Sequence, residues 1–146
     1  MTMREILFRG KRIDNGEWVE GFYAKAKHII SEKEMHIIFQ SGLELFPHSE
    51  FSSYEEVEQA TICQYTGLKD KNGKRIFEGD LVQAVLPPSI SQPSFVWPIM
   101  PVVFSDGVFG LQDQRGGVTP LKSFAPTVTF EVKGNIHDNP ELVKGE

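Results

Sequence analysis

The stretch TGLKDKNGKRIFEGD, residues 66–80, decides how the C-terminal half of the chain folds. It places three glycines and seven charged residues in fifteen positions. Its glycine and lysine spacing resembles a phosphate-binding loop of the form G-x4-G-K-[ST]. However, Gly67 and Gly73 lie one residue too far apart, and Arg75 replaces the hydroxyl residue that binds magnesium. The stretch therefore does not predict nucleotide binding.

A tight turn accounts for the same residues. A two-residue turn at Asn72-Gly73 would place Lys71 opposite Lys74, and like charges in that position are destabilising. A three-residue loop with Gly73 in the left-handed conformation places Asp70 opposite Lys74 instead. We predict the three-residue loop.

Two further glycine turns are predicted elsewhere. The same reasoning applied to Asp14-Asn15-Gly16 avoids placing Asp14 opposite Glu17, so one type of glycine-bulge hairpin is expected twice in the chain. Asp106-Gly107 lies between alternating apolar residues, which is the strongest hairpin signal in the sequence.

The remaining pattern is that of an antiparallel β protein. Short apolar runs alternate with Gly, Asn and Asp, and long helical periodicity is absent. Residues 5–40 predict a β-meander with two hairpins. A helix of about two turns is expected at residues 54–60, because Ser53 and Glu56 have the spacing of a capping box.

The predicted fold class is mainly β, with an N-terminal β-meander, a small SH3-like barrel in the C-terminal half and at most one short helix. The barrel is inferred from a strand starting at Asp80, the Asp106-Gly107 hairpin and a last strand at residues 127–133. The predicted regions are 1–65 (meander and short helix), 66–135 (barrel, with a proline-rich arm at 86–101) and 136–146 (polar tail).

Composition restricts the classes of function. The 146 residues carry a net charge of −5, which argues against a protein whose main role is to coat duplex DNA. No run approaches the roughly 18 apolar residues of a membrane helix. The N-terminal residues lack the apolar core of a signal peptide, and Cys63 is the single cysteine. We expect a cytoplasmic protein without a membrane partner.

Eight of the fifteen basic residues lie in two short segments. Charged hairpin tips normally serve to keep strand edges in solution, and this is the first interpretation. The alternative is a contact with nucleic acid or an acidic partner, which is not favoured. The candidate contact residues are Arg9, Lys11, Arg12, Lys69, Lys71, Lys74 and Arg75.

No catalytic constellation is evident. Glu78 and Asp80 lack a third partner, and Asp80 is expected to accept backbone hydrogen bonds at a bend. The four histidines have no metal-binding spacing, and Cys63 on a strand is expected in the core. We therefore expect no enzyme, no metal and no cofactor. The core is also expected to hold the aromatic residues Trp18, Phe22, Tyr23 and Phe77.

The segment 87–101 contains five of the nine prolines. Proline keeps this segment extended and out of a regular sheet, while its apolar run is too large for a small barrel to cover easily. We expect a homo-oligomer held partly by this segment. The alternative is that the segment folds back over its own barrel. The candidate interface residues are Phe95, Val96, Trp97, Ile99 and Met100.

Four segments resemble the YopX-like family of phage and prophage proteins. TICQYTGLKDKNGKRIFEGDLV resembles the family signature, and REILFRGKRIDNGEWVEGF resembles its opening. VVFSDGVFGL resembles its central hairpin, and EVKGNIHDNPEL its closing segment. The resemblance covers about half of the chain. It differs at Cys63, where the family is expected to have a glycine.

The resemblance implies an origin on mobile elements and a mainly β fold with a small barrel, but no known activity. Together with the residues above, it leads us to expect a non-enzymatic accessory protein in a bacterial host cell. Such a protein would act by self-assembly or by binding a phage or host protein. The alternative is a nucleic-acid-binding module that uses the basic hairpin tips.

Overall fold

The computed structural model describes residues 4–40 and 54–143. In these residues the chain forms strands joined by turns and three short 3₁₀ segments, with no helix of seven residues or more. The strands are β1 (Phe8–Lys11), β2 (Trp18–Lys27), β3 (Glu34–Gln40), β4 (Tyr54–Glu56), β5 (Cys63–Lys69), β6 (Arg75–Phe77), β7 (Asp80–Leu86), β8 (Phe95–Val96), β9 (Met100–Ser105), β10 (Val108–Gln112), β11 (Val118–Pro120) and β12 (Thr129–Asn135). The 3₁₀ segments are η1 (Gln59–Thr61), η2 (Leu121–Ser123) and η3 (Pro140–Leu142).

The chain divides into two compact units, residues 1–65 and 66–146. The boundary falls within β5, whose first residues, Cys63 and Gln64, pair with β1. The strand order is β4-β3-β2-β1-β5-β6 in one sheet and β11-β10-β9-β7-β12 in the other, with β8 paired to β7.

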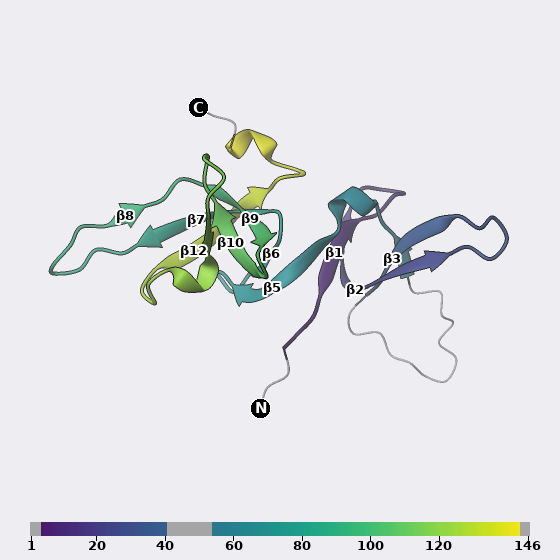
Figure 1. Ribbon diagram of the computed structural model, residues 1–146, viewed down its shortest axis with the longest axis horizontal. Helices are drawn as coiled ribbons and strands as arrows, with labels where there is room; N and C mark the ends of the chain where they lie inside the picture. Colours follow the sequence, from purple (N-terminus) through teal and green to yellow (C-terminus); the bar gives the residue numbers. More distant parts are fainter. Residues whose placement is uncertain (1–3, 41–53, 144–146) are drawn as a thin grey trace. The chain divides into compact units, whose positions relative to one another are not determined.

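The first unit is the predicted β-meander. Strand β2 pairs antiparallel with β1 on one side and with β3 on the other, and β3 continues to β4 (Figure 1). Its core contains Val19, Ile38 and Val57. Gly10 is needed beside this core, because a Cβ there would lie only 3.0 Å from Val57. The meander predicted for residues 5–40 is confirmed.

The predicted helix at residues 54–60 is wrong. Residues 54–56 form β4 instead, and η1 is a single turn. The backbone of this segment is used by neighbouring strands: Val57 N–H donates to the His36 carbonyl at 2.9 Å, and Glu58 N–H to the Lys11 carbonyl at 2.9 Å. Two strands therefore fix an extended conformation that local helix signals do not overcome. The proposed cap, Ser53, lies outside the described residues.

The turn between β2 and β3 lies between His28 and Lys33. Strand β2 ends at Lys27, and the turn is closed by the His28 N–H, which donates to the Lys33 carbonyl at 2.8 Å. Ile29 and Ile30 are therefore exposed in the loop and not part of a strand. Phe22 is exposed too, because Tyr23 next to it on β2 points to the opposite face.

The second unit contains a single core to which most of its strands contribute. The core members lie on β6, β7, β9, β10 and η2, and residues of β5 and β12 pack against them. Strands from both ends of the unit can share one core only if the sheet curves around it, and the sheet is a curled half-barrel. The core residues are Ile76, Val82, Ala84, Met100, Val102, Leu111 and Leu121.

The predicted fold class is confirmed. The chain is mainly β, with a meander and a curled barrel-like sheet and with no long helix in the described residues. The Asp106-Gly107 turn is also confirmed: both residues have positive φ, and Ser105 pairs with Val108 across a two-residue hairpin. Residues 136–143 belong to the second unit and include η3.

Candidate functional site

The loop at Asp70 has the predicted three-residue geometry. Asp70 N–H donates to the Lys74 carbonyl at 2.7 Å, Gly73 N–H donates to the Asp70 carbonyl at 3.0 Å, and Gly73 has a φ of 81°. The side chain of Asp70 completes the loop, because its Oδ1 accepts the N–H groups of Asn72 and Lys74, each at 2.9 Å. The loop is a structural turn with its carboxylate turned inward.

The same carboxylate reaches a distant strand. Oδ2 of Asp70 accepts the backbone N–H of Val132 on β12 at 3.0 Å, and Lys71 N–H donates to the Phe130 carbonyl at 2.9 Å. Strand β12 pairs antiparallel with β7. The backbone groups of successive strand residues point to alternate edges, so the groups of Phe130 and Val132 that meet the loop lie on the edge away from β7. The loop therefore covers the edge of β12 that β7 leaves open.

The surroundings of Asp70 favour its charged form. Burial alone would raise the pKa of this carboxyl, but the N–H groups of Val132, Lys74 and Asn72, followed by the charge of Lys74, lower it below the ordinary value. A carboxylate that accepts three backbone N–H groups has little capacity left for a ligand. The most charged segment of the chain is thus a structural loop whose central carboxylate, that of Asp70, also bonds the backbone of β12.

A second loop repeats the device at Asp113. Asp113 N–H donates to the Gly117 carbonyl at 2.9 Å, and Gly116 has a φ of 88°. Oδ1 of Asp113 accepts the N–H groups of Arg115 and Gly117, each at 2.9 Å. Both loops share the sequence Asp-x-x-Gly, at residues 70–73 and 113–116. The loop at residues 13–16 has four residues, so the glycine-bulge prediction for Asp14-Asn15-Gly16 is wrong.

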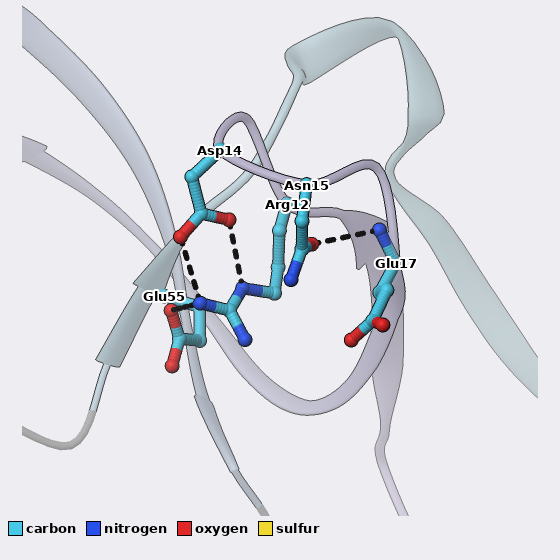
Figure 2. Close-up of polar contacts among 5 residues, drawn as sticks. All are labelled: Arg12, Asp14, Asn15, Glu17 and Glu55. Carbon is cyan, nitrogen blue, oxygen red and sulfur yellow. Dashed lines mark hydrogen bonds and ion pairs between the residues drawn. The ribbon is translucent and has the colours of Figure 1, made fainter.

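Arg12 stabilises that four-residue loop from the side. Its guanidinium bonds both carboxylate oxygens of Asp14, at 3.0 and 2.8 Å, and lies 3.2 Å from Glu55 on β4 (Figure 2). The hydrogen bond from Arg12 lowers the pKa of Asp14. Figure 2 also shows the Asn15 side chain accepting the N–H of Glu17 at 2.9 Å. Arg12 is thus engaged within its own unit.

Arg9 and Lys11 lie over one tryptophan. The guanidinium carbon of Arg9 is 4.6 Å from the Trp18 ring centroid, and Lys11 Nζ is 5.5 Å from it. Arg9 is also buried. Cation–π contacts of this kind hold basic side chains against the sheet. The structure places these candidate contact residues in internal interactions, and their binding to a partner stays a prediction.

The basic residues of the second unit are more accessible. Lys71 Nζ lies 3.5 Å from Glu131 Oε1. The same oxygen lies 2.8 Å from Lys133 Nζ. Lys69 and Lys74 are exposed, and Arg75 is half-buried.

The proline-rich segment forms a hairpin arm. Strand β7 continues to Leu86, and the chain returns as β8, with Val85 opposite Val96 and Leu86 opposite Phe95. Figure 1 shows this hairpin as a long projection of the second unit. Phe95 and Val96 are exposed.

The later part of the arm folds onto its own barrel. Met100 is buried in the core, and Trp97 packs against it. The expectation that the whole run from Phe95 to Met100 lacks cover is therefore wrong for Trp97 and Met100. Their cover is the curled sheet, to which Trp97 N–H is also fixed by donating to the Ala84 carbonyl at 3.0 Å.

Two hollows adjoin Trp97, with volumes of about 720 and 420 Å³. Trp97, Met100 and Asp113 line both of them. Phe124 lines the smaller one, with its ring centroid 5.3 Å from that of Trp97. The sequence prediction did not include Asp113 or Phe124. The Asp-x-x-Gly signal would have placed Asp113 in a turn, whereas no local signal indicates Phe124.

The residues weighed for catalysis have structural positions. Asp80 is buried and its Oδ2 accepts Phe77 N–H at 2.8 Å, which confirms the predicted bend. Cys63 is buried, as expected of a core residue. In residues 4–40 and 54–143, no group of three or more His, Cys, Asp or Glu side chains is placed to hold a metal ion. No helix in the described part of the chain is long and apolar enough to cross a membrane.

The fold defines a mainly β protein with a meander unit and a half-barrel unit. The model of the YopX protein family matches residues 7–144, so the chain belongs to that family. A search of curated proteins gave no match. The chain is similar to the crystal structure of protein EF1440 from Enterococcus faecalis, with 25% identity and a TM-score of 0.57, over 97% of this chain and 100% of that one.

Proposed function

We propose that the protein is a non-enzymatic accessory protein that acts by self-assembly through the β7–β8 arm. We further propose, from the family resemblance, that a phage or prophage carries it and that it works in the cytoplasm of a bacterial host. The observation that carries the self-assembly proposal is the exposure of Ile90, Phe95 and Val96 on one projecting hairpin. Exposed apolar patches usually mark interaction surfaces.

The charge pattern supports the same proposal. No Asp, Glu, Lys or Arg occurs between Asp80 and Asp106, in a chain in which 24% of residues are charged. Strand β8 pairs with β7 alone among the described strands, so its other edge is open. Open strand edges without charged residues favour pairing with another strand. A second copy supplies an identical, neutral and apolar strand, and this makes self-assembly the best-supported mode.

Light scattering tests the proposal. The wild-type protein at micromolar concentration is expected to have a mass of two or more chains of 16.5 kDa each. Replacing Phe95 and Val96 with Ser should lower that mass and leave the strand signal in circular dichroism unchanged. Phe104→Ser is the matched control, because Phe104 is 54% exposed against 53% for Phe95 but lies on β9, outside the arm.

Two results would contradict the proposal. One is a monomeric wild-type protein, and the other is an equal loss of mass in the Phe104→Ser control. An unfolded double variant would show that Phe95 and Val96 stabilise the half-barrel; in that case Ile90→Ser, at the exposed tip, replaces it as the test.

A second candidate function is nucleic-acid binding by the 69–74 hairpin tip, favoured by the exposure of Lys69 and Lys74. Gel shifts with single- and double-stranded DNA and RNA, at low and physiological salt, test it. Binding should weaken steeply with salt and fall when Lys69 and Lys74 are changed to Glu. Absence of binding at micromolar protein would remove this candidate.

A further inference from the structure

The two hollows beside Trp97 both lie within the second unit. They have Trp97, Met100 and Asp113 in common, and their volumes of about 720 and 420 Å³ fall in the range of ligand-binding clefts. The larger one is also lined by Pro98 and Pro101. Neither is lined by Ile90, Phe95 or Val96, the residues on which self-assembly is proposed to depend.

Two aromatic side chains line the hollows: Trp97 lines both of them and Phe124 lines the smaller one, while Phe95 and Phe130 contact these two rings without lining either hollow. The ring of Trp97 meets that of Phe124 at 82°, and Phe124 meets Phe130 at 88°, each pair with centroids 5.3 Å apart. Phe95 meets Trp97 at 77° with centroids 4.8 Å apart. The rings are held from below by the core, against which Trp97, Phe124 and Phe130 pack.

One fixed negative charge borders both grooves. Asp113 is the single ionisable residue among the described residues that line them. Its Oδ1 is held by the N–H groups of Arg115 and Gly117, so the carboxylate cannot rotate away. No described residue donates a hydrogen bond to its Oδ2. The site therefore combines two aromatic side chains packed on the core, Trp97 and Phe124, with a positioned acceptor of single negative charge.

We propose that these grooves bind an extended proline-rich segment of a partner protein, with a lysine or arginine side chain of that segment paired to Asp113. Aromatic-lined grooves accept polyproline II segments because proline rings pack against aromatic side chains and the ligand loses little entropy on binding. The carboxylate at the rim selects a basic residue beside the prolines. A phosphate-containing ligand would instead meet like charge at the same position.

The proline-rich tip of the chain's own arm does not fit this chemistry. Residues 87–94, PPSISQPS, contain no lysine or arginine. A second copy would thus leave Asp113 unpaired in the occupied groove. The expected occupant is a different protein, which makes this site independent of self-assembly.

Fluorescence anisotropy with labelled synthetic peptides tests the proposal. The first peptide has ten residues, mostly proline and alanine, with one arginine; the second has glutamate in place of the arginine; the third has glycine in place of every proline. A fourth corresponds to residues 86–95 of this chain. The first is expected to bind with a Kd below about 1 mM, more tightly than the other three.

A pair of protein variants isolates the carboxylate. Asp113→Asn keeps an Oδ1 acceptor for the two loop N–H groups but removes the charge. It should weaken binding of the arginine peptide about two- to fivefold, the contribution of one partly exposed ion pair, and leave the glutamate peptide no weaker. Asp106→Asn is the control, because Asp106 lies in the β9–β10 turn with a φ of 52°, which asparagine tolerates, and lines neither groove.

Any of four results would overturn the proposal. The first is that the arginine peptide does not bind at about 1 mM. The second and third are that the glycine peptide binds as tightly as the arginine peptide, or that the chain's own segment binds more tightly than it. The fourth is that Asp106→Asn and Asp113→Asn weaken binding of the arginine peptide equally. If Asp113→Asn loses its strand signal in circular dichroism, the salt dependence of wild-type binding replaces it. The arginine peptide must then lose affinity with salt while the glutamate peptide does not.

Discussion

The carboxylate of Asp70 accepts the backbone N–H of Val132 at 3.0 Å, although 62 positions separate the two residues in the sequence. The same carboxylate closes its own loop through Asn72 and Lys74. A hairpin tip that would otherwise be only a charged turn thus covers a strand edge of the half-barrel. This segment, the most site-like in the sequence, therefore has a structural role in closing the half-barrel.

Replacing Asp70 with Asn should destabilise the protein. Asparagine retains one acceptor oxygen for the loop, but its NH₂ group cannot accept the N–H of Val132. Leaving that donor without a partner is expected to cost about 1–3 kcal/mol of unfolding free energy, measured by urea denaturation. Asp113→Asn is the matched control and should cost less than about 0.5 kcal/mol, because both of its loop bonds use Oδ1. Equal costs for the two variants would contradict the role of the Val132 bond.

Stability should depend on the charge of Asp70. Its pKa is lowered in the folded state, so the unfolded chain binds the proton more tightly. The stabilisation is therefore present above the ordinary carboxyl pKa of 3.8 and is lost as the pH falls through the lower folded value. Denaturation between pH 7 and pH 2 should show a smaller loss of stability in Asp70→Asn than in the wild type. The same acid dependence in both proteins would exclude Asp70 as a source.

Gly73 is expected to tolerate asparagine better than alanine. No atom lies within 4 Å of a Cβ built at Gly73, so space does not limit substitution, but its φ of 81° disfavours ordinary residues. Gly73→Ala should cost about 1–2 kcal/mol, and Gly73→Asn less, because asparagine visits the left-handed region more readily. Thermal melting of both variants checks the order. A neutral Gly73→Ala would mean that the three-residue loop is not retained in solution.

Arg12 is expected to contribute little to stability despite its three close oxygen contacts. Its partner Asp14 is exposed, and exposed ion pairs contribute little to stability because water and salt screen them. Arg12→Ala should therefore lower the urea midpoint slightly at low salt and by less at high salt, where screening weakens the pair. A loss as large as that of Asp70→Asn would indicate that the Glu55 contact is a buried interaction, contrary to the observed geometry.

Local sequence predicted local structure. The charge pairing of Asp70 with Lys74 predicts the three-residue loop, and Asp106-Gly107 predicts the hairpin between β9 and β10, because both features are decided by residues a few positions apart. The capping signal at residues 53–56 failed for a non-local reason. Hydrogen bonds with the distant residues His36 and Lys11 hold that segment extended.

The arm and the grooves beside Trp97 were only partly predictable. The apolar run from Phe95 to Met100 identified the arm, but its alternation between solvent and core depends on pairing with β7, which the prolines obscured. The contact of Trp97 with Phe124 joins residues from different parts of the half-barrel, and one sequence holds no signal for it. Asp113 shares the Asp-x-x-Gly signal of Asp70, which predicts its turn but not its position beside Trp97.

Amide hydrogen exchange at Val132 tests the closure of the half-barrel most directly. Its N–H is bonded to a buried carboxylate, so in the wild-type protein it should exchange as slowly as the amides of the core strands, and Asp70→Asn should accelerate it well beyond the change seen at those amides. Rapid exchange of the Val132 amide in the wild type, or unchanged exchange in the variant, would contradict the conclusion that the Asp70 carboxylate holds β12 through this hydrogen bond.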